Sequence, residues 1–312
     1  MITLAWLYVL AGATFAAFAA LSLSDRTNSK RFGNAAFWGL IAISFFFGDQ
    51  LGDFGNGLLV TGLVALAGFH LLGRGDPHTT RPEERAESAE RRGNKLFLPA
   101  LIIPVTALLG TLLLKDSGLV DPKQATLISL GLGVLIALAV CYIWLRPPVL
   151  APLQEGRRLM DSVGWAAVLP QMLAALGAVF ALAGVGEVVG GIAGTAIPQG
   201  SLFAAVAAYA VGMALFTMIM GNAFAAFPVM TAAIGLPILV HKFGGDPAIV
   251  CAIGMLAGFC GTLMTPMAAN FNIVPAALLD LKDRNGVIKA QIGTAVPLLL
   301  ANTLLIYFLA FR

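Results

Sequence analysis

The sequence predicts an all-α membrane protein, a polytopic transmembrane helical bundle of about 8–10 membrane segments. Of the 312 residues, 59% are hydrophobic and only 11% are charged, whereas about a quarter of the residues in a soluble domain are charged. Apolar runs of about 17–22 residues recur between short charged clusters, as transmembrane helices require. A transmembrane β-barrel would show short segments of alternating polarity instead.

The first half of the chain is expected to form an N-terminal bundle of five spans within residues 1–145. The first span follows Met1 without a basic region, and its apolar stretch is too long for a signal peptide. Gly and Ala are frequent in this half and suit close packing of helices. The five predicted spans cover residues 2–23, 34–52, 57–73, 96–114 and 125–145.

Four polar connections contain 15 of the 19 Lys and Arg residues, namely 24–33, 74–95, 146–164 and 282–290. The positive-inside rule places these connections in the cytoplasm and both termini outside. The loop 74–95 interleaves Glu with Arg and is predicted to form a solvated helix. The basic excess thus orients the protein in the bilayer, and no nucleic-acid partner is needed to explain it.

The second half, residues 165–312, differs from the first in that glycine, proline and polar residues interrupt its apolar tracts. We expect spans at about 165–184 and 290–311, with a glycine-rich, broken end near residues 177–198. Between them lie two long apolar tracts, 201–241 and 247–281, and polar residues interrupt both. The tract 201–241 suits either a re-entrant hairpin or two full spans, because both return the chain to the same side.

Two clusters of polar and helix-breaking residues interrupt these tracts, near 221–222 and within 262–275. Backbone freed by a broken helix costs several kcal/mol per unsatisfied group in hydrocarbon, so it survives only inside protein or beside a wet cavity. Secondary transporters use such breaks to bind substrates and coupling ions. We therefore predict substrate-binding roles for Asn222, Thr262, Thr265, Asn270 and Asn272, ion-binding roles for Gly221, Asn222 and Thr265, and helix-breaking roles for Pro228, Pro266 and Pro275.

These side chains are neutral, and no Lys or Arg lies within 203–241 or 247–281. Neutral amides and hydroxyls suit a carrier that must release a small carboxylate. A proton relay requires carboxylates at membrane depth, and Glu187 is the one candidate well inside the apolar segments of this half. The pattern therefore favours Na⁺ over H⁺ as the coupling ion, and no other cofactor or metal is expected.

Nearly the whole chain resembles a bacterial permease family assigned as a subunit of a 5-oxoproline (pyroglutamate) transporter and earlier described only as a domain of unknown function. The resemblance is carried by the strings SDRTNSKRFGNAAFWGL, EGRRLMDSVGWAAVLPQMLAALGAVFALAGVGEVV, LFTMIMGNAFAAFPVMTAAIGLP and GTLMTPMAANFNIVPAALLDLKDRNGVIKAQ. It implies an inner-membrane location, a carboxylate substrate and a heteromer with a smaller membrane subunit.

More distantly, residues 165–312 resemble one repeat of the ion-transporter superfamily of sodium-coupled dicarboxylate and citrate carriers. Gly221, Asn222 and Ala223 would lie at the tip of its re-entrant hairpin, and residues 265–270 would form its unwound loop. The chain departs from that pattern at the tip, where only Asn222 matches a Ser-Asn-Thr motif. Such carriers need two repeats, so a second membrane subunit or a second copy of this chain is implied.

Three other functions remain open, and one of them is a passive channel, which uphill accumulation that needs an ion gradient would exclude. A chain with one repeat would serve as a non-transporting scaffold subunit if its partner held the whole site. An intramembrane enzyme should show a catalytic constellation, yet the sequence has no H-E-x-x-H or G-x-S-x-G motif and no recognisable acid–base pair. We therefore expect a transporter subunit and no enzymatic activity.

Overall fold

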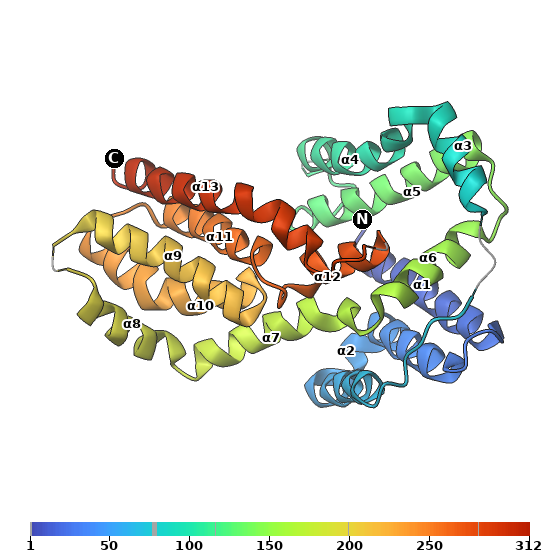
Figure 1. The fold of residues 1–312 in the computed structure, drawn as a ribbon, viewed down its shortest axis with the longest axis horizontal. Coiled ribbons are helices and arrows are strands. Elements are labelled where there is room, and N and C mark those ends of the chain that lie inside the picture. The colour runs from blue at the N-terminus through green and yellow to red at the C-terminus, as the bar shows by residue number, and fades with distance from the viewer. Residues whose placement is uncertain (1, 77–79, 116, 199, 280) are drawn as a thin grey trace. The chain divides into compact units, whose positions relative to one another are not determined.

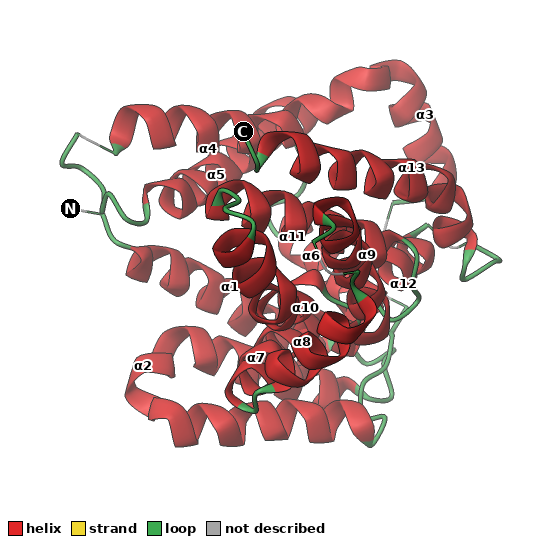
Figure 2. Cartoon of the chain, turned by 90° about the vertical axis from the view of Figure 1, so that its left-hand side faces the viewer, coloured by secondary structure: helices red, strands yellow, loops and turns green. Residues whose placement is uncertain are grey.

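The computed structural model describes residues 2–76, 80–115, 117–198, 200–279 and 281–312. Within these residues the chain is helical and contains no strand (Figure 2), apart from one isolated bridge between Ile2 and Val120. Seven described helices are long and apolar enough to cross a membrane, or eight if one bent pair forms a single span. The prediction of an all-α, polytopic helical bundle is confirmed.

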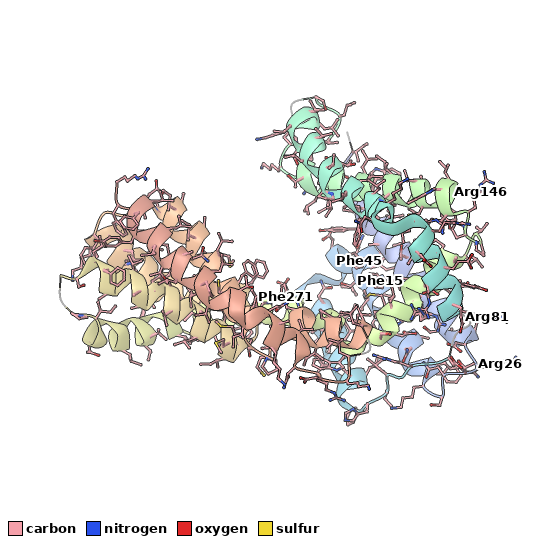
Figure 3. The ribbon with its side chains drawn as sticks, turned by 45° about the horizontal axis from the view of Figure 1, so that its top comes forward. Phe15, Arg26, Phe45, Arg81, Arg146 and Phe271 are labelled. Atoms are coloured by element: carbon pink, nitrogen blue, oxygen red, sulfur yellow. The ribbon has the colours of Figure 1, made fainter. Side chains whose placement is uncertain are left out.

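The chain divides into two compact units, residues 1–164 and residues 165–312. Unit 1 begins with α1 (Leu4–Ser24) and α2 (Arg31–Gly68), which pack against each other. The rings of Phe15 and Phe45 stack between these helices with their centroids 5.7 Å apart (Figure 3). Aromatic stacking of this kind adds about 0.5–1.5 kcal/mol to the burial of the rings.

The two predicted spans 34–52 and 57–73 form the arms of α2, which is broken at Gly52. The φ of Gly52 is 61°, a left-handed conformation that glycine adopts without steric cost. The second arm ends at Gly68, so the last residues of the predicted span 57–73 lie outside the helix.

Unit 1 continues with the paired helices α4 (Leu98–Leu114) and α5 (Ala125–Leu145). Their backbones approach closely, because a Cβ added to Gly133 would lie 3.0 Å from the carbonyl oxygen of Ile103. Small residues allow this contact between apolar helices.

The polar segments of unit 1 also form helices: α3 (Pro82–Arg92), η1 (Gly93–Phe97) and α6 (Ala151–Val163). Helix α3 carries acidic residues in its first turn and arginines in its last turn, an arrangement that complements the helix dipole. Helix α6 packs against α1 and buries Arg157, so the predicted connection 146–164 is partly helical and belongs to unit 1.

Unit 2 consists of helices of unequal length (Figure 1). After η2 (Gly164–Val168), its elements are α7 (Leu169–Leu182), α8 (Val185–Ala196), α9 (Leu202–Met220), α10 (Ala223–Met230), the π-helix η3 (Thr231–Lys242), α11 (Pro247–Leu263), α12 (Ala269–Leu278) and α13 (Gly286–Leu309). The axes of α7 and α8 differ by 71°. This bend is the glycine-rich break expected within 177–198.

The core of unit 2 depends on backbone-to-backbone packing of α11 against α9. A Cβ on Gly261 would collide with the carbonyl oxygen of Ala214, and one on Gly254 would collide with the hydroxyl of Tyr209. Tyr209 is fully buried and its hydroxyl pairs with Thr231 at 3.2 Å. The glycines of α11 therefore hold α9 at a distance that no larger residue permits.

Candidate functional site

The first helix break separates α9 from α10 at Gly221 and Asn222. Gly221 has a φ of 77° and closes α9 through a hydrogen bond from its N–H to the carbonyl of Thr217. Asn222 starts α10 as its N-cap: its Oδ1 accepts a hydrogen bond from Phe224 N at 2.8 Å. Asn222 is only 5% exposed, so this turn is buried within the protein.

The second break, residues 264–268, lies against the first. The hydroxyl of Thr265 donates a hydrogen bond to the carbonyl oxygen of Met218, 47 residues away, at 2.9 Å, and it accepts one from Met267 N. A Cβ added to Gly221 would lie 2.5 Å from the carbonyl oxygen of Met267. The two interruptions predicted from the sequence are thus in direct contact.

The buried side chain of Asn272 stabilises the second break through two hydrogen bonds. Its Nδ2 donates to the carbonyl oxygens of Thr262 and Thr265, both at 2.7 Å. The hydroxyl of Thr262 donates to the carbonyl of Phe259 at 2.6 Å. These bonds satisfy backbone carbonyls that a broken helix leaves free.

Two buried oxygens near the breaks have no hydrogen-bond partner among the described residues: Asn272 Oδ1 and Thr217 Oγ1. Both residues are 0% exposed. An unpaired buried acceptor costs about 1–3 kcal/mol, so each is a ready ligand for a hydrogen-bond donor or, through its oxygen, for a hard cation. Thr217 was not predicted from the sequence, although it lies one turn before Gly221 in an otherwise apolar helix.

Asn270 differs from the other predicted residues. It is partly exposed, and its side-chain amide makes no hydrogen bond within the described part of the chain. Of the five predicted substrate-binding residues, it therefore has the amide most free to bind a ligand. Asn222, Thr262, Thr265 and Asn272 all hold backbone groups of the breaks.

Helix ends of both signs meet at the site. The carbonyl ends of α9 and α11 and the N–H ends of α10 and α12 all lie at the two breaks. The former carry partial negative charge and the latter partial positive charge. The two breaks therefore present partial charges of both signs without a charged side chain.

The structure corrects the expectation that all three prolines break helices. Pro266 lies in the non-helical segment, but Pro228 lies inside α10 and Pro275 inside α12. Pro228 precedes the π-helix η3, whose wider turns begin at Thr231. A proline lacks the N–H of a helical hydrogen bond and displaces the carbonyl one turn earlier. The change of helix type accommodates that displacement without ending the helix.

Neither a search of curated proteins nor a search of solved structures finds a match for this chain. A scan against protein families finds one whose sequence profile matches residues 5–311, nearly the entire length. The chain is thus a member of the family described as "Protein of unknown function (DUF979)".

Proposed function

We propose that this chain is an integral-membrane subunit of a secondary active transporter for a small organic carboxylate. The observation that carries the proposal is the contact between the two helix breaks in unit 2, through Thr265 and the Met218 carbonyl. In secondary transporters, opposed helix ends bind substrate and coupling ion near the middle of the bilayer.

The carboxylate would lie at the N–H ends of α10 and α12, beside the side-chain amides of Asn222 and Asn270. Neutral donors and helix dipoles would hold the anion without the strong attraction of a fixed Arg or Lys. 5-Oxoproline is the leading substrate candidate, through the resemblance of the sequence to a permease family assigned to it.

Na⁺ is the proposed coupling ion. The unpaired oxygens of Thr217 and Asn272 and the carbonyl ends of α9 and α11 are oxygen ligands, which hard cations prefer. A site of neutral oxygens binds Na⁺ without a titrating carboxylate, as coupling by Na⁺ instead of H⁺ requires.

The segment 202–242 is proposed to be a re-entrant hairpin. Its two arms, Leu202–Met220 and Ala223–Lys242, are each long enough to span a bilayer. A turn between two full spans would face water, yet Gly221, Asn222 and Ala223 are buried. The second break packs against this tip, and from that break the chain runs through α12, which is about 15 Å long, before it reaches the charged residues 282–284.

One such repeat forms only half of a carrier of this type, so we propose that a second membrane subunit, or a second copy of this chain, supplies the other half. The chain would work in the bacterial inner membrane as the larger subunit of a symporter.

The test is uptake of labelled 5-oxoproline into proteoliposomes containing the full chain, with and without candidate partner subunits, under imposed Na⁺ or H⁺ gradients. We expect accumulation driven by Na⁺ that is lost in Asn270→Ala and reduced in Asn222→Ala. Asn285→Ala serves as the matched control, because Asn285 is exposed and lies outside the breaks.

Transport unchanged by Asn270→Ala and Asn222→Ala, in protein that still assembles, would place the substrate site in the partner and leave this chain as a scaffold. Accumulation driven by H⁺ alone would refute the assignment of the coupling ion. If another small carboxylate were transported and 5-oxoproline were not, the assignment of 5-oxoproline would be wrong, but the assignment of a carboxylate transporter would stand.

A further inference from the structure

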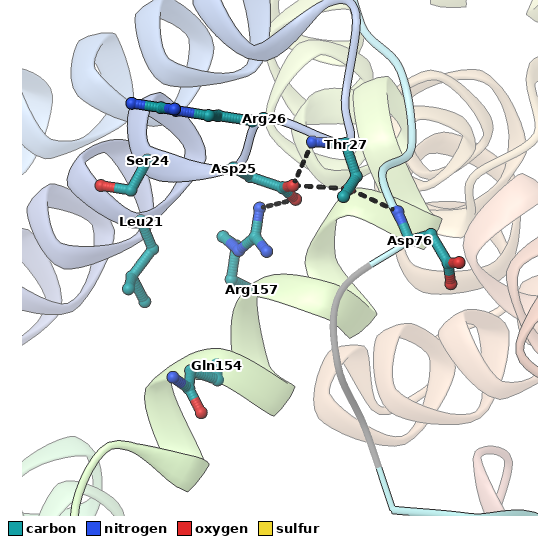
Figure 4. Close-up of a pocket in the computed structure, with 8 residues that line it drawn as sticks. All are labelled: Leu21, Ser24, Asp25, Arg26, Thr27, Asp76, Gln154 and Arg157. Carbon is teal, nitrogen blue, oxygen red and sulfur yellow. Dashed lines mark hydrogen bonds and ion pairs between the residues drawn. The ribbon is translucent and has the colours of Figure 1, made fainter.

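Unit 1 contains a polar pocket at the end of a membrane-spanning helix, and the transport proposal makes no use of it (Figure 4). The pocket has a volume of about 610 Å³. Asp25 and Arg26 directly follow α1, a candidate span, and Leu21 of that span also lines the pocket. The pocket therefore lies where a spanning helix reaches the polar surface of the bilayer.

Arg157 of α6 forms the inner wall of this pocket and is only 5% exposed. Its Nη1 donates to Asp25 at 2.9 Å and to Asp161 at 3.5 Å. Its Nε is buried and has no hydrogen-bond partner within the described part of the chain. A guanidinium has five N–H donors, so the ion pairs leave part of its donor capacity unused beside the cavity.

The carboxylate of Asp25 already accepts three hydrogen bonds. Its Oδ1 accepts from Thr27 N at 3.0 Å and from the Thr27 hydroxyl at 2.6 Å, and its Oδ2 accepts from Arg157. Burial alone would raise the pKa of Asp25, but these hydrogen bonds and the guanidinium outweigh it and lower the pKa. Asp25 therefore remains ionised and fixes Arg157 in place.

The rim of the pocket adds charges of both signs. Arg26 and Asp76 are exposed and line it, and neither side chain forms an ion pair or hydrogen bond among the residues described. With Asp25 and Arg157, the lining holds two cations and two anions. A simple anion would meet the two carboxylates and a simple cation the two guanidinium groups, whereas a zwitterion matches both.

We propose that this pocket binds the headgroup of a zwitterionic phospholipid, a phosphate ester with a primary ammonium group. The phosphate would accept from Arg157 and Arg26, in the geometry by which guanidinium groups bind phosphate. The ammonium would donate to Asp76. Leu21, on the membrane-spanning helix, would contact the first carbons of the lipid chains, which continue into the bilayer beside α1.

The test compares three phospholipids with identical acyl chains on the purified full chain in detergent, using native mass spectrometry to measure the bound fraction. Phosphatidylethanolamine carries both a phosphate for the arginines and a primary ammonium group for Asp76. Phosphatidylcholine carries a cation that cannot donate a hydrogen bond, and phosphatidylglycerol lacks a cation. We expect phosphatidylethanolamine to be retained about threefold to fivefold better than either of the others, the size expected for one partly exposed charged contact.

Two surface substitutions test the assignment of the headgroup. Asp76→Asn should remove the preference for phosphatidylethanolamine over phosphatidylglycerol, and Arg26→Gln should weaken binding of all three lipids. Arg158→Gln is the matched control. Arg158 directly follows Arg157 in the sequence, but it pairs with Glu155 at 2.7 Å and does not line the pocket.

Equal retention of the three lipids, or equal losses in Arg158→Gln and Arg26→Gln, would overturn the proposal. Soluble phosphoethanolamine provides the remaining arm: if it binds as tightly as the lipid, the site belongs to a soluble ligand and the lipid assignment is wrong. If it binds much more weakly, the acyl chains contribute, as contact with Leu21 requires.

Discussion

Replacement of Gly221 by alanine tests whether the two helix breaks are docked together. Two separate costs are expected. The φ of Gly221 is 77°, and a left-handed backbone costs an L-residue about 1–2 kcal/mol. In addition, the new Cβ would lie 2.5 Å from the carbonyl oxygen of Met267. Backbone atoms cannot rotate away, so this overlap should cost about 1–3 kcal/mol more.

Gly244→Ala separates the two costs. Gly244 has a φ of 74° and follows η3 much as Gly221 follows α9, but a Cβ there has no atom within 4 Å. Only the conformational cost should appear, so Gly244→Ala should lower the free energy of unfolding by about 1–2 kcal/mol and Gly221→Ala by about 2–5 kcal/mol.

The assay is reversible unfolding of the purified protein in mixed micelles with increasing SDS, followed by tryptophan fluorescence. The difference between the two variants measures the contact between the hairpin tip and the second break. Equal losses of stability in the two variants would refute the docking of the tip against Met267.

Three further predictions concern helix packing and the charge cluster of unit 1. Gly190→Ala should destabilise the protein by about 1–3 kcal/mol, because the new Cβ would lie 2.9 Å from the carbonyl oxygen of Ala233. Gly191→Ala is the control: a Cβ there meets open space, so the variant should be neutral or stabilised by up to about 1 kcal/mol. Unfolding in SDS measures both variants. Arg157→Met should lower the free energy of unfolding by about 3–5 kcal/mol in the same assay, because Asp25 and Asp161 would lose their shared cation. Burial raises the pKa of Asp161 above its unfolded value. The wild-type protein should therefore lose stability as pH rises from about 4 through that raised pKa. Melting curves recorded between about pH 4 and 8 should show this loss in the wild-type protein and not in Asp161→Asn. A wild-type stability that instead rises over this window would contradict the sign for Asp161.

The membrane-spanning helices and the positions of the two breaks could be predicted from the sequence. Apolar runs are a local signal, and Asn222 and Thr265 each interrupt such a run. The contact between the breaks could not be predicted, since the hydroxyl of Thr265 binds the backbone carbonyl of Met218. A backbone group has no signature in the sequence, and the two partners are 47 residues apart.

Two side chains show how local patterns mislead. Pro275 is a helix breaker by its chemistry, yet it lies within α12. Arg157 belongs to a basic polar connection, a local pattern typical of solvated side chains, yet its side chain is buried within unit 1. The i,i+4 pair with Asp161 was the available signal for it, but the partner Asp25 lies 132 residues away and becomes a neighbour only in the folded protein.

The bond between Thr265 and the Met218 carbonyl also determines how this region can open. The hairpin tip cannot leave its place without releasing the second break, and the second break cannot unwind further without losing its anchor on α9. The two segments should therefore form a single cooperative unit in local unfolding. In amide hydrogen exchange, we expect the N–H groups of Gly221 and Met267 to exchange at one common rate, because the two helix breaks should open together.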